Sequence, residues 1–159
     1  MSLVTGMNHV AVVTDDLDRF VDFYTSVFDL DVVFEETTPA FRHAILRTGP
    51  DSWLHPAELQ GNPHGSAVPA MFDRGHLDHL ALTVASPEAF TTLRQRLEER
   101  GAEAGGVDDL GAFHSLWFED PDGMRVELVA IVDPELRGIH EPRPLSPPPP
   151  TDQRLTASG

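Results

Sequence analysis

An internal repeat constrains the fold of this chain more than any other feature of its sequence. When the sequence is moved along itself by 70 positions, the distance from His9 to His79, the run NHVAV around His9 lies over the run DHLAL around His79. The same displacement places Phe20 over Phe90, and both lie in segments with a helical spacing of apolar residues. Self-similarity of this kind indicates one supersecondary unit that is present twice. We therefore predict two related modules.

Each module is expected to follow the order βαβββ, which gives an α+β fold with two tandem modules. The first module spans residues 6–61, a connector containing Gly and Pro spans 62–74, and the second module spans 75–132. Each module opens with a short apolar strand, at 7–13 and at 77–84, and continues with an amphipathic helix. The remaining strands are expected at 31–35, 41–47 and 53–60 in the first module and at 102–107, 112–119 and 125–131 in the second.

Local signals mark the ends of the two helices and the last turn. Thr14 is expected to cap the first helix, with three Asp residues in the first turn. Ser86 followed by Pro87 predicts the start of the second helix, and Gly101 predicts its end. The run DPDG at 120–123 predicts a turn between the last two strands.

The composition changes after residue 132. Seven of the fourteen prolines lie between Pro134 and Pro150. Because proline lacks the N–H group that a sheet ladder needs, residues 133–159 are expected to be extended or disordered and to stay outside the sheet.

Charge and composition exclude several classes of function. Asp and Glu outnumber Lys and Arg by 26 to 11, so nucleic acid and anionic membranes are unfavourable partners. The absence of cysteine excludes disulfides, thiolate metal sites and a cysteine nucleophile, whereas eight histidines leave metal ligation by nitrogen and oxygen open. With no pattern of a secretory leader and no run of about 18 apolar residues, we expect a soluble, cytoplasmic protein that acts on a small molecule.

Histidines and glutamates recur at matched positions in the two modules. Strand alternation places His9 and His79 each on a strand face with small neighbours, where an imidazole has room for a ligand. Glu58 follows His9 by 49 positions and Glu127 follows His79 by 48, and such a donor set leaves coordination positions open for a substrate. We therefore predict a metal site of His9, His79 and Glu127. Glu58 is either a fourth ligand or a residue of the cavity wall.

Taken together, the repeated βαβββ pattern, the two strand-opening histidines and the run SLWFEDPDGMRVE at 115–127 resemble the vicinal oxygen chelate superfamily. This superfamily contains glyoxalase I, extradiol ring-cleaving dioxygenases, fosfomycin-modifying enzymes and bleomycin-binding proteins. The resemblance covers residues 6–132. It implies a cupped, eight-stranded mixed half-barrel around a metal cavity, with ligand positions at His9, His79 and Glu127. The chemistry that it implies is bidentate binding of two adjacent substrate oxygens to a divalent metal, which can be Fe, Mn, Zn, Ni or Co.

Two details favour a member similar to the extradiol dioxygenases. The run FRHAIL at 41–46 resembles the third strand of those enzymes, and His43 takes the position of their acid–base histidine. Two histidines and one carboxylate also leave three coordination positions on Fe(II) or Mn(II). The chain departs from the pattern at Trp117, where those enzymes usually carry tyrosine, and no histidine occurs in the loop 108–111. Trp117 and Phe113 are instead expected to line a pocket for a planar or apolar substrate.

Two other functions remain open. A glyoxalase I-like lyase needs Glu58 to point inward, where a glutamate returns a proton to the substrate. A drug-binding resistance protein without catalysis is the second alternative, although paired inward histidines are unexpected in it. The resemblance also implies a homodimer. The other histidines are expected to be solvated in loops or at strand edges, namely His55, His64, His76 and His140.

Overall fold

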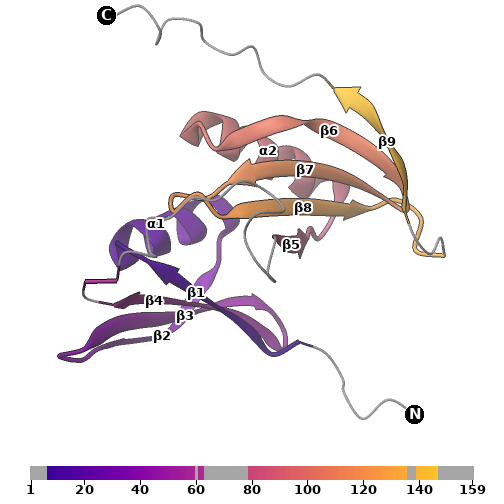
Figure 1. Ribbon diagram of the computed structural model, residues 1–159. Helices are drawn as coiled ribbons and strands as arrows, with labels where there is room; N and C mark the ends of the chain where they lie inside the picture. Colours follow the sequence, from indigo (N-terminus) through magenta and orange to yellow (C-terminus); the bar gives the residue numbers. More distant parts are fainter. Residues whose placement is uncertain (1–6, 60, 63–78, 136–138, 147–159) are drawn as a thin grey trace, which may run out of the picture. The chain divides into compact units, whose positions relative to one another are not determined.

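The computed structural model describes residues 7–59, 61–62, 79–135 and 139–146. Contacts between residues divide the chain into two compact units (Figure 1). Unit one comprises Met1–Leu77 together with Asp120–Met124, and unit two comprises Asp78–Glu119 together with Arg125–Gly159. The turn at 120–124 therefore packs with the first unit, although its neighbours in the sequence belong to the second.

Unit one contains a four-stranded mixed sheet and one helix. Its strands lie in the order β1-β4-β3-β2, with β1 parallel to β4 and the other neighbours antiparallel. This arrangement confirms the first predicted βαβββ module. The elements are β1 (His9–Thr14), α1 (Leu17–Phe28), β2 (Asp31–Thr37), β3 (Phe41–Gly49) and β4 (Ser52–Leu59).

Helix α1 supplies most of the core of unit one. Its apolar residues recur at helical spacing, and Leu17, Phe20 and Tyr24 are at most 1% exposed. Burial of side chains of this size contributes roughly 1.5–3 kcal/mol each. The predicted cap at Thr14 is wrong by two residues, because Asp16 is the N-cap and accepts a hydrogen bond from the backbone N–H of Arg19. The Thr14 hydroxyl accepts instead from the backbone N–H of Asp16, one step before the helix.

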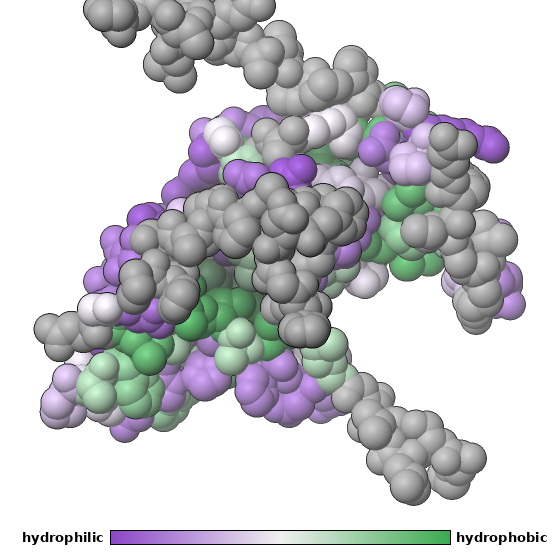
Figure 2. Space-filling model, viewed as in Figure 1, coloured by the Kyte–Doolittle hydropathy of each residue, from purple (hydrophilic) through white to green (hydrophobic). Residues whose placement is uncertain are grey.

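The sheet of unit one has one covered face and one open face. Ala44, Leu46 and Leu54 are at most 1% exposed and lie on the face that α1 covers. All seven residues of β2, the edge strand, are exposed, and Figure 2 shows hydrophobic residues at the surface of this unit. Acidic side chains on β2 discourage pairing of this edge with another strand.

Unit two repeats the arrangement and adds one strand. Its order is β5-β8-β7-β6-β9, again with the first pair parallel and the other neighbours antiparallel. Ser86 caps α2, Pro87 opens it and Gly101 ends it with a positive φ of 67°, all as predicted. The second βαβββ module and the α+β class are thereby confirmed. The elements are β5 (Leu80–Thr83), α2 (Pro87–Arg100), β6 (Glu103–Gly111), β7 (Phe113–Glu119), β8 (Arg125–Ile131) and β9 (Ile139–Ser146).

Strand β9 was not expected, because the proline-rich tail was predicted to stay outside the sheet. Residues 139–146 pair antiparallel with β6, and Pro144 lies opposite Asp108. The sheet therefore has five strands, and the nine strands described exceed the eight predicted. The physical reason is that β9 is an edge strand, which pairs with a neighbour on one side only. A proline whose nitrogen lies on the open side therefore costs no hydrogen bond of the sheet. Among the described residues, neither helix is long and apolar enough to cross a membrane.

Candidate active site

The open face of the sheet in unit one carries His9. His9 pairs with Trp53 and lies on the face opposite α1, whereas Thr14 on the same strand is buried against the helix side. The His9 Nδ1 lies 2.9 Å from the side-chain oxygen of Asn8. Because an amide oxygen only accepts, the ring donates from Nδ1 and keeps the lone pair of Nε2. This tautomer leaves a lone pair on Nε2, which the predicted ligand role requires, and that role stays a prediction.

Two further histidines lie on the same face. The ring of His55 lies 5.7 Å from that of His9 and 5.1 Å from that of His43, centroid to centroid. We call this side of the sheet, which carries His9, His55 and His43, the histidine face. The expectation that His55 is a solvated loop or edge residue is wrong, because His55 lies in the interior of β4 and is half-buried. Alternation from Trp53 was the sequence signal for its placement, since both point away from the buried Leu54.

His43 does not stand alone on this face. Its Nδ1 lies 2.8 Å from Nε2 of His55, and its Nε2 lies 3.1 Å from a carboxylate oxygen of Glu36 on β2. Both ring nitrogens of His43 are thus engaged by protein groups. The predicted acid–base role of His43 stays a prediction, but the structure assigns its hydrogen bonds to His55 and Glu36.

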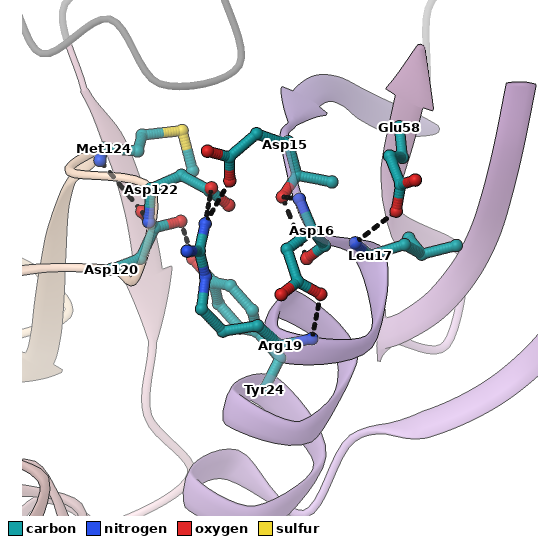
Figure 3. A network of polar contacts seen from close by, with 10 residues as sticks. Asp15, Asp16, Leu17, Arg19, Tyr24, Glu58, Asp120, Asp122 and Met124 are labelled. Atoms are coloured by element: carbon teal, nitrogen blue, oxygen red, sulfur yellow. Dashed lines mark hydrogen bonds and ion pairs between the residues drawn. The ribbon is translucent and has the colours of Figure 1, made fainter. Parts of the chain in front are cut away.

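Glu58 lies on the other face of the sheet. It pairs with Thr14, and its Oε2 accepts a 2.9 Å hydrogen bond from the backbone N–H of Leu17 (Figure 3). The Arg42 guanidinium lies 3.5 Å from the same oxygen. Glu58 therefore satisfies one of the free N–H groups at the start of α1 and does not meet His9. This position weighs against the predicted alternatives of a fourth metal ligand and an inward glutamate base.

Replacing Glu58 distinguishes a structural role at the start of α1 from a role as a metal ligand. We expect Glu58→Ala to lower the free energy of unfolding by about 1 kcal/mol, because it removes an acceptor at the start of α1. The content of bound metal should not change, since Glu58 lies on the face opposite His9. Chemical denaturation and elemental analysis measure the two quantities, with Glu35→Ala on the exposed edge strand as the control. Loss of metal in Glu58→Ala at unchanged stability would restore the ligand assignment.

Unit two brings two of the predicted ligands together. Glu127 on β8 is only 6% exposed, and its Oε1 accepts a 2.5 Å hydrogen bond from the hydroxyl of the fully buried Ser115. Its Oε2 lies 3.9 Å from Nε2 of His79. Ser115 thus orients the carboxylate and leaves one oxygen on the side of His79. Ser115 was not predicted as a site residue. The available signal was strand alternation, which places Ser115 on the same face of β7 as Trp117.

The predicted pocket residues lie on this same face of unit two. Trp117 pairs with Glu127, and its ring meets the ring of His79 edge-on at 4.8 Å. Phe113 has the same strand parity, whereas His114 lies on the other face, as its spacing predicts. The guanidinium of Arg125 lies 5.9 Å from the centroid of the Trp117 ring. An aromatic ring beside His79 and Glu127 suits a planar substrate, and the pocket role of both aromatics stays a prediction.

A separate polar network anchors the turn at 120–124 to α1 (Figure 3). The hydroxyl of the buried Tyr24 donates a 3.0 Å hydrogen bond to Asp120, which also accepts from the backbone N–H groups of Asp122 and Met124. Arg19 bonds to Asp122. Burial raises the pKa of Asp120 to about 6 despite these donors. The sequence predicted the turn but not its attachment to α1.

Among the residues that the structure describes, no three side chains of His, Asp or Glu gather into a group that could hold a metal ion. Of the three predicted ligands, His9 belongs to unit one, and His79 and Glu127 belong to unit two; their role as ligands stays a prediction. His64 and His76 lie outside the described residues, as does the side chain of His140.

Comparison with known proteins agrees with the architecture. Residues 6–128 match the family described as the Glyoxalase/Bleomycin resistance protein/Dioxygenase superfamily. A lactoylglutathione lyase of Salmonella typhimurium is 30% identical over 129 residues, which are 79% of this chain and 92% of the relative. A Bacillus subtilis protein named as a ring-cleaving dioxygenase is 27% identical over 143 residues, which are 87% of this chain and 44% of the relative.

Solved structures show the same fold. A glyoxylase/bleomycin resistance protein/dioxygenase domain from Frankia sp. EAN1pec superposes with a TM-score of 0.70 at 24% identity, covering 81% of this chain and 99% of the other. A glyoxalase family protein from Enterococcus faecalis superposes with a TM-score of 0.63 at 26% identity, covering 80% and 99%. The matched range, residues 6–128, extends over most of both modules. The chain therefore belongs to the glyoxalase/bleomycin resistance protein/dioxygenase superfamily, also known as the vicinal oxygen chelate superfamily.

Proposed function

We propose that this chain is a divalent-metal enzyme of extradiol-dioxygenase type that acts on a small molecule with two adjacent oxygens. The ligands that we propose are His9, His79 and Glu127. The observation that carries the proposal is the paired arrangement in unit two, where the buried Ser115 fixes one oxygen of Glu127 and the other lies 3.9 Å from Nε2 of His79.

The residues present fit such an ion. His9 keeps the lone pair of Nε2 because Asn8 engages Nδ1, and Glu127 offers an oriented carboxylate oxygen. Two neutral nitrogens and one carboxylate suit Fe, Mn, Zn, Ni or Co. When bound, a divalent metal would withdraw electron density from two adjacent substrate oxygens. Trp117 lies beside His79 and would hold a planar ring against this site.

A lyase of the glyoxalase I type is the second candidate. It is favoured by the 30% identity to a lactoylglutathione lyase over 92% of that relative, against 44% coverage of the dioxygenase relative. The position of Glu58 counts against it, because Glu58 binds the start of α1 and faces away from His9. His55, which does lie beside His9, is a different chemical group from the glutamate that this alternative requires.

A two-part assay decides between these functions. Protein purified without chelator is analysed for bound metal and then tested for oxygen uptake with catechols and for turnover of a hemithioacetal. We expect about one metal ion per chain and oxygen uptake with a catechol. Turnover of the hemithioacetal alone would support the lyase, and metal-free protein that binds an apolar drug would support a resistance protein. A homodimer and a cytoplasmic location stay predictions.

A further inference from the structure

Four polar side chains form a continuous row across the histidine face of unit one. His9 on β1 is followed by His55 on β4, His43 on β3 and Glu36 on β2, in the order of the strands in the sheet. Hydrogen bonds join the last three, and a ring contact joins His55 to His9. The proposed metal ligands do not account for this row, since only His9 belongs to both.

The proton positions in the row follow from its last member. An ionised carboxylate only accepts hydrogen bonds, so Nε2 of His43 carries the proton that Glu36 accepts. A neutral His43 then has a lone pair on Nδ1, and Nε2 of His55 must donate the 2.8 Å hydrogen bond to it. His55 thus keeps the lone pair of Nδ1, and it makes no second hydrogen bond with the described residues.

Burial and distances agree with this arrangement. His55 is half-buried in the interior of β4, and its Nε2 lies 2.8 Å from Nδ1 of His43. The row runs from the half-buried His55 to Glu36, whose side chain is 52% exposed. The carboxylate oxygen of Glu36 lies 3.1 Å from Nε2 of His43, within reach of a hydrogen bond from it.

We propose that Glu36 and His43 are positioning residues that hold His55 as a hydrogen-bond acceptor for a hydroxyl group of the substrate. The inference rests on the proposed function, because the substrate is taken to lie beside His9. An unprotonated nitrogen accepts a hydrogen bond from a hydroxyl group. An ether or a carbonyl oxygen has no proton to donate and therefore binds less favourably at the same place. The group that His55 would select is therefore a hydroxyl beside His9, in preference to an ether or a carbonyl oxygen at the same place.

The tautomer is tested first, in chelator-treated protein and therefore without any metal. Nitrogen-15 NMR at pH 8, where an ordinary imidazole is neutral, distinguishes protonated from unprotonated ring nitrogens. We expect protonated Nε2 and unprotonated Nδ1 in both His43 and His55. In His43→Phe the proton on Nε2 of His55 should lose its hydrogen bond and exchange faster with water. In Glu36→Gln the amide oxygen still accepts from His43, so the hydrogen bond from Nε2 of His55 to His43 should be retained. A proton on Nδ1 of His55 would overturn the proposal.

The role toward substrate is tested by binding. Zn(II)-loaded protein avoids redox turnover, and its affinities for catechol and for 1,2-dimethoxybenzene are compared. We expect His55→Phe to reduce the preference for catechol by roughly 2- to 10-fold, the value of one neutral hydrogen bond. Because the metal is present in every protein compared, its contribution cancels from this change in preference. His43→Phe should act in the same direction, and Trp53→Phe, on the same strand and face, should leave the preference unchanged.

The outcomes separate this proposal from the proposed function. An unchanged preference in both His55→Phe and His43→Phe, with circular dichroism showing folded protein, would overturn the role of His55 while leaving the metal site intact. Failure of the chain to bind any divalent metal would instead overturn the proposed function. The NMR experiment would still decide the tautomer in that case, because it needs no metal.

Discussion

Replacing His79 with alanine will leave the protein folded and remove its ability to retain a divalent metal ion. His79 supplies one of three proposed ligands, and its Nε2 lies 3.9 Å from the carboxylate of Glu127. Loss of a residue that only orients a ligand typically weakens metal binding 10- to 100-fold. Loss of the ligand itself should exceed about 100-fold for that reason. Elemental analysis and calorimetric titration with Zn(II) measure the effect, and far-UV circular dichroism checks the fold.

Two further variants, a control and one with a smaller expected loss, are compared with His79→Ala. His114→Ala is the matched control, because His114 lies in the same unit but on the other face of β7. It should retain full metal affinity. Ser115→Ala removes the hydroxyl that holds Oε1 of Glu127, so we expect an intermediate loss of about 10- to 100-fold. One equivalent of tightly bound metal in His79→Ala would exclude His79 as a ligand.

The second large effect is a pH dependence of stability that comes from Asp120. Burial raises the pKa of this carboxyl from 3.8 to about 6, a shift that corresponds to about 3 kcal/mol. A group whose pKa is raised on folding contributes stability that is fully present below its unfolded pKa and is lost as the pH rises through its folded pKa. The contribution of Asp120 to the free energy of unfolding should therefore fall by about 3 kcal/mol between about pH 4 and pH 6.

Asp120→Asn isolates this contribution from that of every other titrating group. The amide cannot ionise, so the difference in unfolding free energy between the two proteins should change by about 3 kcal/mol over that pH range. Urea denaturation at a series of pH values measures the difference. Tyr24→Phe should cost about 1–3 kcal/mol near pH 7, where a buried carboxylate loses a donor, and less in acid. A constant difference between Asp120→Asn and the wild type would show that Asp120 titrates normally.

Much of the fold was predictable because it rests on local and periodic signals. The repeat around His9 and His79 predicted both βαβββ modules, and the cap at Ser86 and the stop at Gly101 located α2 correctly. The strand β9 was missed because composition reports the presence of prolines but not their position in a sheet. An edge position tolerates Pro144, and only the paired structure identifies an edge.

The candidate site was predictable only in part. Strand alternation places the side chains of His79 and Glu127 on the same face of the sheet in unit two. In the structure, Nε2 of His79 lies 3.9 Å from Oε2 of Glu127. The role of Glu58 was left open because its phase depends on β4, where alternation relative to the buried Leu54 decides the face. The same phase brings His55 beside His9. A shift of one residue in a strand moves a side chain to the opposite face, so an uncertain phase gives an uncertain site.

The sequence alone determined that the chain consists of two copies of one βαβββ unit with a histidine opening each copy. The sequence contains that information because repeats and periodicity are properties of the order of residues along the chain. Only the tertiary structure decided that Ser115 holds Glu127, that Glu36, His43 and His55 form one row, and that Asp120 is buried against α1. These contacts join residues whose distance in space depends on strand register and helix packing, and neither is encoded in the spacing of residues along the chain.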